Sequence, residues 1–334
     1  MKRLSPSDIR GFLKEMAAHT AVYCPQRVYG GDLLLLPLGE GLFEGCNGKS
    51  ANTIKSLLFP HREEIVSFSG ERISRVLDDS TALVFGIRPC EMRAVHFTDR
   101  FMSRDHLPDP HYLSRRTNMT TVVVACSEPP RETCFCLDAG GAPFLEKGFD
   151  VQLFEAGEDY IALPGSTRGE ELLSNALFRN PKEGDGDLVA RLKESAVRSQ
   201  SPGPGMQKAM DVLKGEKPDR AFWEGLAERC LNCGGCVYVC PTCTCFNVYD
   251  LPSDGGHMRY RAWDACLHAG FTREASGHNP RPTPGSRLQR RVEHKLKYDP
   301  INFNESGCVG CGRCSEACPV GLGAMEIAKA LNGL

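Results

Sequence analysis

Two runs of cysteines near the C-terminal end repeat one spacing, and this repeat constrains the chain more than any other feature. The runs are Cys230-x-x-Cys233-x-x-Cys236-x-x-x-Cys240-Pro241 and Cys308-x-x-Cys311-x-x-Cys314-x-x-x-Cys318-Pro319, here called the first and second cysteine motifs. Three thiolates at steps of three residues can wrap one [4Fe–4S] cube in a tight loop. The cysteine before proline lies too far along to close the same cube and reaches a partner cube instead. The fold must therefore bring both motifs together.

The predicted ligand sets cross between the motifs, as they do in two-cluster bacterial ferredoxins. One [4Fe–4S] cluster is expected to take Cys230, Cys233, Cys236 and Cys318, and the other Cys308, Cys311, Cys314 and Cys240. Zinc is the alternative, but zinc sites favour two separated Cys-x-x-Cys pairs closed tetrahedrally. Disulfides are disfavoured, because the polar N-terminus shows no secretory leader and a reducing cytoplasm is expected.

Length, charge and hydropathy set broad limits on the class of protein. A chain of 334 residues favours about two domains. A net charge of −2 argues against a nucleic-acid partner. The strongest apolar run, residues 33–38, contains a proline and is too short to span a bilayer. We therefore expect a cytoplasmic protein with no membrane span.

The pattern of apolar residues predicts an α/β N-terminal domain. Residues 82–87 and 121–125 are continuous apolar runs of strand length, as in sheets buried on both faces. Further elements are expected at a helix ending near 18, a strand at 32–37, paired strands within 150–163, and helices at 170–178, at 188–199 and from 219. The predicted organisation is an α/β domain (1–180), a helical linker (181–215) and a two-cluster ferredoxin-like α+β module (216–334) with a long insert (241–307).

A second group of cysteines lies in the predicted N-terminal domain. Cys90 and Cys126 follow predicted strands, and Cys134 and Cys136 lie just beyond in Thr133-Cys-Phe-Cys136. Loops at the carboxyl ends of parallel strands converge on one sheet edge, so these four thiols could hold a third iron–sulfur cluster. The alternative is that they are small buried core residues.

Other candidate residues have weaker patterns. Cys243, Cys245 and Cys266 are expected to pack around the cubes, because the ferredoxin ligands are already complete, and Cys24 and Cys46 have no assignable role. His278 and His294 could be ligands or proton carriers, but hydrogen-bonded or exposed histidines are more common. The basic stretch from Arg287 to Lys297 is expected to be a solvated helix face, with neutralisation of anionic clusters or docking of an acidic partner as alternatives.

No Gly-x-Gly-x-x-Gly fingerprint or phosphate loop is present, so a nicotinamide or flavin site on this chain lacks its usual signature. No acid–base or nucleophile constellation is apparent either. The chemistry that remains is the storage and relay of single electrons.

Several longer motifs carry a resemblance to a known family. They are Lys55-Ser-Leu-Leu-Phe-Pro-His-Arg-Glu63, Gly86-Ile-Arg-Pro-Cys-Glu91, Cys134-Phe-Cys136, Phe149-Asp150, Cys240-Pro-Thr-Cys-Thr-Cys-Phe246, Arg261-Ala-Trp-Asp-Ala-Cys266, Gly277-His-Asn-Pro-Arg281 and His294-Lys295. The chain resembles the β subunits of the hydrogenase/sulfur reductase (sulfhydrogenase) family, to which an iron–sulfur component of anaerobic sulfite reductase also belongs. It departs at Ser276, where the family usually has glycine, and at Leu322-Gly323, where it usually has Ile-Asp.

The resemblance implies an electron-transfer subunit of an anaerobic, cytoplasmic redox complex. Such a subunit relays electrons between a partner that binds flavin and NAD(P) and a catalytic subunit, which can be a nickel–iron hydrogenase, a sulfite reductase or another reductase. The alternative is a self-sufficient iron–sulfur reductase with a catalytic N-terminal cluster. Four cysteine ligands at that site would leave no open coordination position, which favours the relay.

Overall fold

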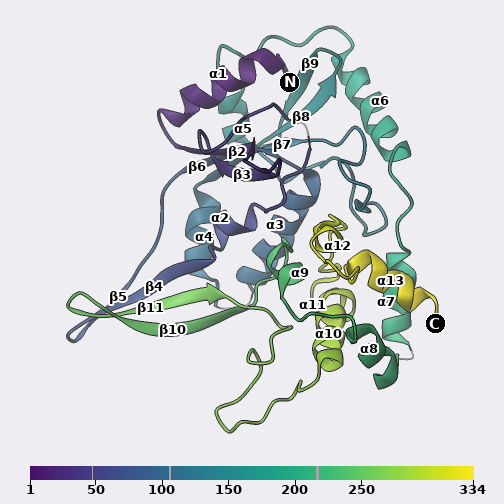
Figure 1. Cartoon of the computed structure of the whole chain (residues 1–334). Coiled ribbons are helices and arrows are strands. Elements are labelled where there is room, and N and C mark those ends of the chain that lie inside the picture. Colours follow the sequence, from purple (N-terminus) through teal and green to yellow (C-terminus); the bar gives the residue numbers. More distant parts are fainter. Residues whose placement is uncertain (47, 105–106, 216–217) are drawn as a thin grey trace.

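The computed structural model describes residues 1–46, 48–104, 107–215 and 218–334 as a mixed α/β protein (Figure 1). The strands are β1 (Lys2–Leu4), β2 (Ala21–Arg27), β3 (Leu33–Pro37), β4 (Arg62–Ser69), β5 (Arg72–Arg75), β6 (Ala82–Ile87), β7 (Met119–Val124), β8 (Val151–Ala156), β9 (Asp159–Pro164), β10 (Phe246–Ser253) and β11 (Gly256–Trp263). They form a seven-stranded sheet in the order β1-β9-β8-β7-β6-β2-β3 and a four-stranded sheet in the order β10-β11-β4-β5.

The helices flank the larger sheet and build the C-terminal part. They are α1 (Pro6–Ala17), α2 (Lys55–Leu58), α3 (Pro89–Met102), α4 (Pro110–Thr117), α5 (Thr167–Leu172), α6 (Asp185–Arg198), α7 (Met206–Lys214), α8 (Arg220–Ala227), α9 (Gly235–Tyr238), α10 (Pro284–Glu293), the π-helical turn η1 (His294–Tyr298), α11 (Asp299–Phe303), α12 (Arg313–Glu316) and α13 (Ala324–Asn332). No helix in the described ranges is both long and apolar enough to cross a membrane.

The seven-stranded sheet has a parallel centre. Strands β2, β6, β7 and β8 pair in parallel, whereas β3, β9 and β1 pair antiparallel at the edges. Alternate residues of β6 face opposite sides: Leu83 and Phe85 pack in the core that contains α1, and Val84 packs in the core that contains α3. The predicted strands at 82–87 and 121–125 are thus present as β6 and β7, and both faces of the sheet are buried.

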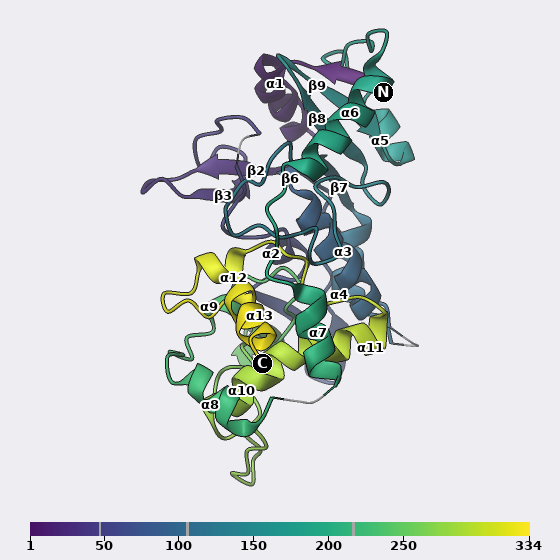
Figure 2. The ribbon, with the colours of Figure 1, turned by 90° about the vertical axis from the view of Figure 1, so that its right-hand side faces the viewer.

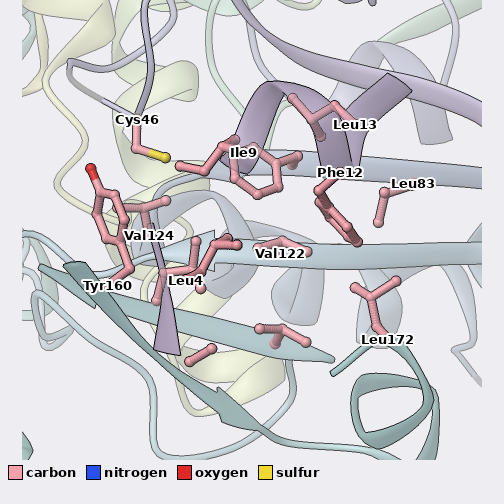
Figure 3. Packing of buried hydrophobic residues seen from close by; sticks show 14 of the residues in the cluster. Leu4, Ile9, Phe12, Leu13, Cys46, Leu83, Val122, Val124, Tyr160 and Leu172 are labelled. Carbon is pink, nitrogen blue, oxygen red and sulfur yellow. The ribbon is translucent and has the colours of Figure 1, made fainter. Parts of the chain in front are cut away.

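Helix α1 packs its apolar stripe on one face of this sheet. Ile9, Phe12 and Leu13 are fully buried and share one core with Leu83 of β6 and Val122 of β7 (Figure 3). Phe12 packs edge-on against Phe178, with 5.2 Å between the ring centroids. The helical spacing of these side chains is what gives an amphipathic helix one buried face.

One predicted helix is shorter in the structure than expected. Helix α5 ends at Leu172, so the prediction of a helix over 170–178 is wrong for most of its length. Asn175 explains the difference, because its side-chain oxygen accepts a hydrogen bond from the backbone N–H of Leu177 at 2.9 Å. Such an Asx turn competes with continued helical hydrogen bonding.

The four-stranded sheet joins segments that are far apart in the sequence. The hairpin of β10 and β11 comes from the insert, and β11 pairs antiparallel with β4 of the N-terminal half (Figure 1). Arg261 on β11 donates a hydrogen bond to Glu63 on β4 at 2.7 Å, and the indole N–H of Trp263 donates to the carbonyl of Phe59 at 2.9 Å. The sheet therefore spans the boundary that we predicted near residue 215.

The C-terminal helices share a core of their own at the end of the molecule away from α1 (Figure 2). Helix α13 packs on α7, and α10 packs on α8. Trp223, Leu213 and Leu331 are among its fully buried side chains. This core supports the loops that carry the two cysteine motifs.

Replacing Phe12 by alanine tests the packing of the larger sheet. The truncation removes a fully buried ring, and we expect the free energy of unfolding to fall by about 3–5 kcal/mol. Lys14→Ala, on the exposed face of the same helix, is the matched control and should change it by less than about 0.5 kcal/mol. Urea unfolding followed by circular dichroism measures both, with cluster absorbance recorded separately because the parts can unfold in steps. Equal losses in both variants would contradict the packing.

Candidate metal centres

The first cluster site is the cavity surrounded by Cys230, Cys233, Cys236 and Cys318, which has about 400 Å³ of empty space. Gly234, at a φ of +74°, lets the chain turn sharply between Cys233 and Cys236. The fourth cysteine comes from the second motif, where the backbone N–H of Leu322 donates to the Cys318 sulfur at 3.2 Å. The structure thus brings together the four predicted ligands of one cluster, across the two motifs.

The predicted ligands of the second cluster are Cys308, Cys311, Cys314 and Cys240, and this group is here called the second cluster site. Burial raises the pKa of Cys308 to about 11 and that of Cys314 to about 12, and charge repulsion from Cys311 and Cys240 adds to both shifts. The backbone N–H of Ala324, at the start of α13, donates to the Cys314 sulfur at 3.3 Å. Thiols with raised pKa values stay protonated at neutral pH, so metal binding would have to displace their protons.

The N-terminal cysteine site is a cavity with about 320 Å³ of empty space, lined by Cys90, Cys126, Cys134 and Cys136. Cys90 lies in the first turn of α3 directly after β6, and Cys126 follows β7. The carboxyl ends of two neighbouring parallel strands therefore carry these two cysteines to one edge, as expected for an open α/β sheet. Whether the four thiols bind a cluster stays a prediction.

A cysteine of the second motif also lines the N-terminal cysteine site. Cys311 borders the same cavity and packs with Cys90 against Ala94 and Val309. The backbone N–H of Phe135 donates to the carbonyl of Gly310 at 2.9 Å. The second motif and the Cys134–Cys136 loop are thus in direct contact, a proximity that the spacing of cysteines did not indicate.

Two buried cations beside the N-terminal cysteine site were missed by the sequence analysis. Lys49 is 2% exposed, and its ammonium lies 2.6 Å from the carbonyl of Cys311 and 3.6 Å from the sulfur of Cys134. Arg88 donates to the carbonyls of Cys46 at 2.5 Å and Gly48 at 2.8 Å. Arg88 lies within Gly86-Ile-Arg-Pro-Cys-Glu91 and could have been singled out there, whereas Lys49 has no recognisable motif.

The basic stretch from Arg287 to Lys297 is not a solvated face, so that prediction is wrong. Arg287, Arg291 and Lys295 are buried on one side of the helical segment: Arg287 donates to the carbonyl of Leu267, and Arg291 and Lys295 lie beside cysteines of the two motifs. Lys295 donates to the hydroxyl of Thr242 at 2.7 Å and to the carbonyl of Gly307 at 3.1 Å. Burial disfavours its charge, but the nearby thiolates raise the pKa of Lys295 above its ordinary value.

The remaining candidates fall outside these three sites. Cys24 and Cys46 lie in the core of the seven-stranded sheet, where burial raises the pKa of each to about 12, and Figure 3 shows Cys46 there. His278 is exposed, and His294 lies 3.3 Å from Asp299. Cys243, Cys245 and Cys266 gather around another cavity beside the second cluster site.

The donor sets fit iron–sulfur clusters. All seventeen cysteines are free, and the ligands predicted for the first cluster and the four N-terminal cysteines each line one cavity. In the described part of the chain, no three His, Cys, Asp or Glu side chains are placed to hold a single metal ion. Thiolates at the corners of a cavity suit a cube, which is larger than one ion.

Cys318→Ser tests the crossed ligation. We expect this change to perturb the cluster of the first motif, because Cys318 lines the first cluster site. The EPR spectrum of the reduced protein should then resemble that of Cys233→Ser and differ from that of Cys311→Ser. A spectrum that matches Cys311→Ser instead would show that the crossing is absent.

A quadruple Cys→Ser change at positions 90, 126, 134 and 136 tests the N-terminal cysteine site. Anaerobically purified protein should lose about four irons per chain relative to the wild type. Cys24→Ala, which removes a buried thiol from the sheet core, is the control and should keep its iron. Unchanged iron content in the quadruple variant, measured together with the visible spectrum, would rule out a cluster at this site.

Comparisons with known proteins agree with this geometry. Residues 229–322 match the family model described as a 4Fe-4S dicluster domain, so the mixed α/β chain carries such a domain at its C-terminal end. The chain is 31% identical to the sulfhydrogenase 2 subunit beta of Pyrococcus furiosus over 282 residues, which cover 82% of this chain and 80% of that protein. No solved structure matches. The resemblance seen in the sequence motifs is confirmed: the chain belongs to the family of sulfhydrogenase β subunits.

Proposed function

We propose that this chain is an iron–sulfur electron-transfer subunit of a hydrogenase or reductase complex in the cytoplasm. It would relay single electrons between a partner that binds flavin and NAD(P) and a catalytic subunit, such as a nickel–iron hydrogenase or a sulfite reductase. The observation that carries the proposal is the row of adjoining cysteine sites in one chain. Its dicluster domain and its similarity to a sulfhydrogenase β subunit support the same role.

Contacts between neighbouring sites support a continuous path. Buried Arg291 has Cys236 of the first cluster site and Cys314 of the second as its strongest charge neighbours. Cys311 of the second cluster site lines the N-terminal cysteine site and packs near Cys90. Bound [4Fe–4S] clusters would supply one-electron storage, and the second cluster site has the other two sites as neighbours.

The residues of the chain would hold each cluster and offset its negative charge. Cysteine thiolates bind the iron, while the backbone N–H groups of Leu322 and Ala324 donate to Cys318 and Cys314. Hydrogen bonds to cluster sulfur and nearby positive charge raise reduction potentials. Buried Lys49 and Lys295 supply such charge at the N-terminal and second cluster sites.

The test of the proposal is electron transfer by the isolated chain. Anaerobically purified protein should be reduced by dithionite but should not oxidise NADH, because hydride chemistry needs a flavin or an equivalent group to divide two electrons into single ones. Adding the flavoprotein of the same complex should restore NADH-dependent reduction of the clusters, followed by visible absorbance. The Cys318→Ser variant should accept fewer electrons from it.

Two results would contradict the proposed electron-transfer function. One is bound flavin in the purified chain together with steady NADH oxidation. The other is failure of the clusters to accept electrons from the flavoprotein although dithionite reduces them fully.

A further inference from the structure

Three cysteines outside the predicted ligand sets line a cavity of their own. Cys243, Cys245 and Cys266 surround about 390 Å³ of empty space together with Arg291 and Lys295. We call this cavity the insert site, because all three cysteines lie in the insert 241–307. The first cluster site and the N-terminal cysteine site, each lined by at least four cysteines, have about 400 and 320 Å³. The insert site is therefore as large as the cavities expected to hold cubes.

The hairpin of the insert builds this site. Cys245 directly precedes β10 and Cys266 follows β11, and the two strands pair with Phe246 opposite Trp263. The backbone N–H of Asp264 donates to the carbonyl of Cys245 at 3.0 Å, which extends this pairing to the cysteines. The thiols of Cys245 and Cys266 are close neighbours, as are those of Cys243 and Cys240. The last contact connects the insert site to the second cluster site.

Buried positive charge surrounds the insert site. Lys55 is 5% exposed, and its ammonium donates to the carbonyls of Cys243 at 3.1 Å and Tyr238 at 3.2 Å, with the ring of Trp263 at 3.7 Å. Among the described residues, no carboxylate forms an ion pair with Lys55. Buried Lys295 and Arg291 line the cavity itself. Cations removed from water are costly unless negative charge lies close to them, and an anionic cluster held by thiolates would supply it.

We propose that Cys243, Cys245 and Cys266 bind an additional iron–sulfur cluster in the insert site. Three cysteines leave one iron of a cube without a cysteine ligand. The rest of the wall contains His294 and Asp299 as well as the cations. This iron is open to a small anionic ligand, which none of the sites with four cysteines can offer. The cluster gives the chain a place where an electron from the relay meets a bound molecule.

The iron content of a Cys243→Ser/Cys245→Ser/Cys266→Ser variant tests the proposal. We expect about four fewer irons per chain than in the wild type, with the EPR signals of the first and second cluster sites retained. This difference in iron content does not depend on how many other sites are filled. The proposal of a cluster in the insert site can therefore fail while the proposed electron-transfer function is upheld. Cys24→Ala serves as the control and should match the wild type. An unchanged iron content in the triple variant would overturn the proposal.

Two measurements on the wild-type protein cover the case in which the triple variant does not fold. Iodoacetamide should leave the three thiols unmodified in the iron-loaded chain and alkylate them after the clusters are removed, as read by mass spectrometry. Cyanide, a small anion that binds iron, should change the EPR spectrum of the reduced protein. Alkylation of the three thiols in the iron-loaded chain, a disulfide between Cys245 and Cys266, or a spectrum indifferent to cyanide would each count against the open cluster.

Discussion

The close approach of two backbones joins the N-terminal half of the chain to the second cysteine motif, and the row of cysteine sites depends on it. Gly310 has a φ of +67°, and a Cβ atom there would lie 2.6 Å from the carbonyl oxygen of Phe135. At Gly312, with a φ of +72°, a Cβ atom would lie 2.2 Å from the carbonyl oxygen of Thr133. Only glycine allows both the left-handed turn and this contact. Without it, Cys311 could not border the cavity of Cys134 and Cys136.

The same junction concentrates buried positive charge around the thiols. Arg313 forms an ion pair with Glu91 at 3.2 Å and donates to the carbonyl of Ser50 at 2.9 Å, while Lys49 bonds the carbonyl of Cys311. Burying cations in this way is costly on its own. Glu91 offsets part of this cost for Arg313, and Glu316 does so for Lys49, while anionic clusters bound at the cysteine sites would offset more of it. Cluster binding and domain docking should therefore be coupled, because both depend on the same charges.

The elements that could be predicted from the sequence are those with a local signal. The apolar run at 82–87 coincides with β6, and the spacing of the motifs anticipated that Cys318 would lie with the cysteines of the first motif. Features that depend on contacts between distant segments could not be predicted. The pairing of β11 with β4 is an example, because the sequence of neither strand indicates which strand it pairs with. Charged residues at helical spacing normally face water, yet Arg291 and Lys295 are buried beside the cysteine motifs, where a bound anionic cluster would offset their charge. A single lysine such as Lys49 has no pattern of its own, so its role becomes visible only when the fold brings the sulfur atoms near.

The length of the insert has a structural reason. A loop between two cysteine motifs needs few residues to connect them, but a loop alone would leave its cysteines free to move. Here the first part of the insert folds as a hairpin, and β11 pairs with β4. Hydrogen bonds from Arg261 to Glu63 and from Trp263 to the carbonyl of Phe59 add to this strand pairing. Rigid strands hold ligands in position more accurately than loops do. The cysteines at the base of the hairpin, Cys245 and Cys266, are thus held by a sheet that also belongs to the N-terminal half, and the Lys55 ammonium lies over the Trp263 ring. An insert that served only as a spacer would need none of these contacts, and their presence argues that the position of its cysteines matters to the protein.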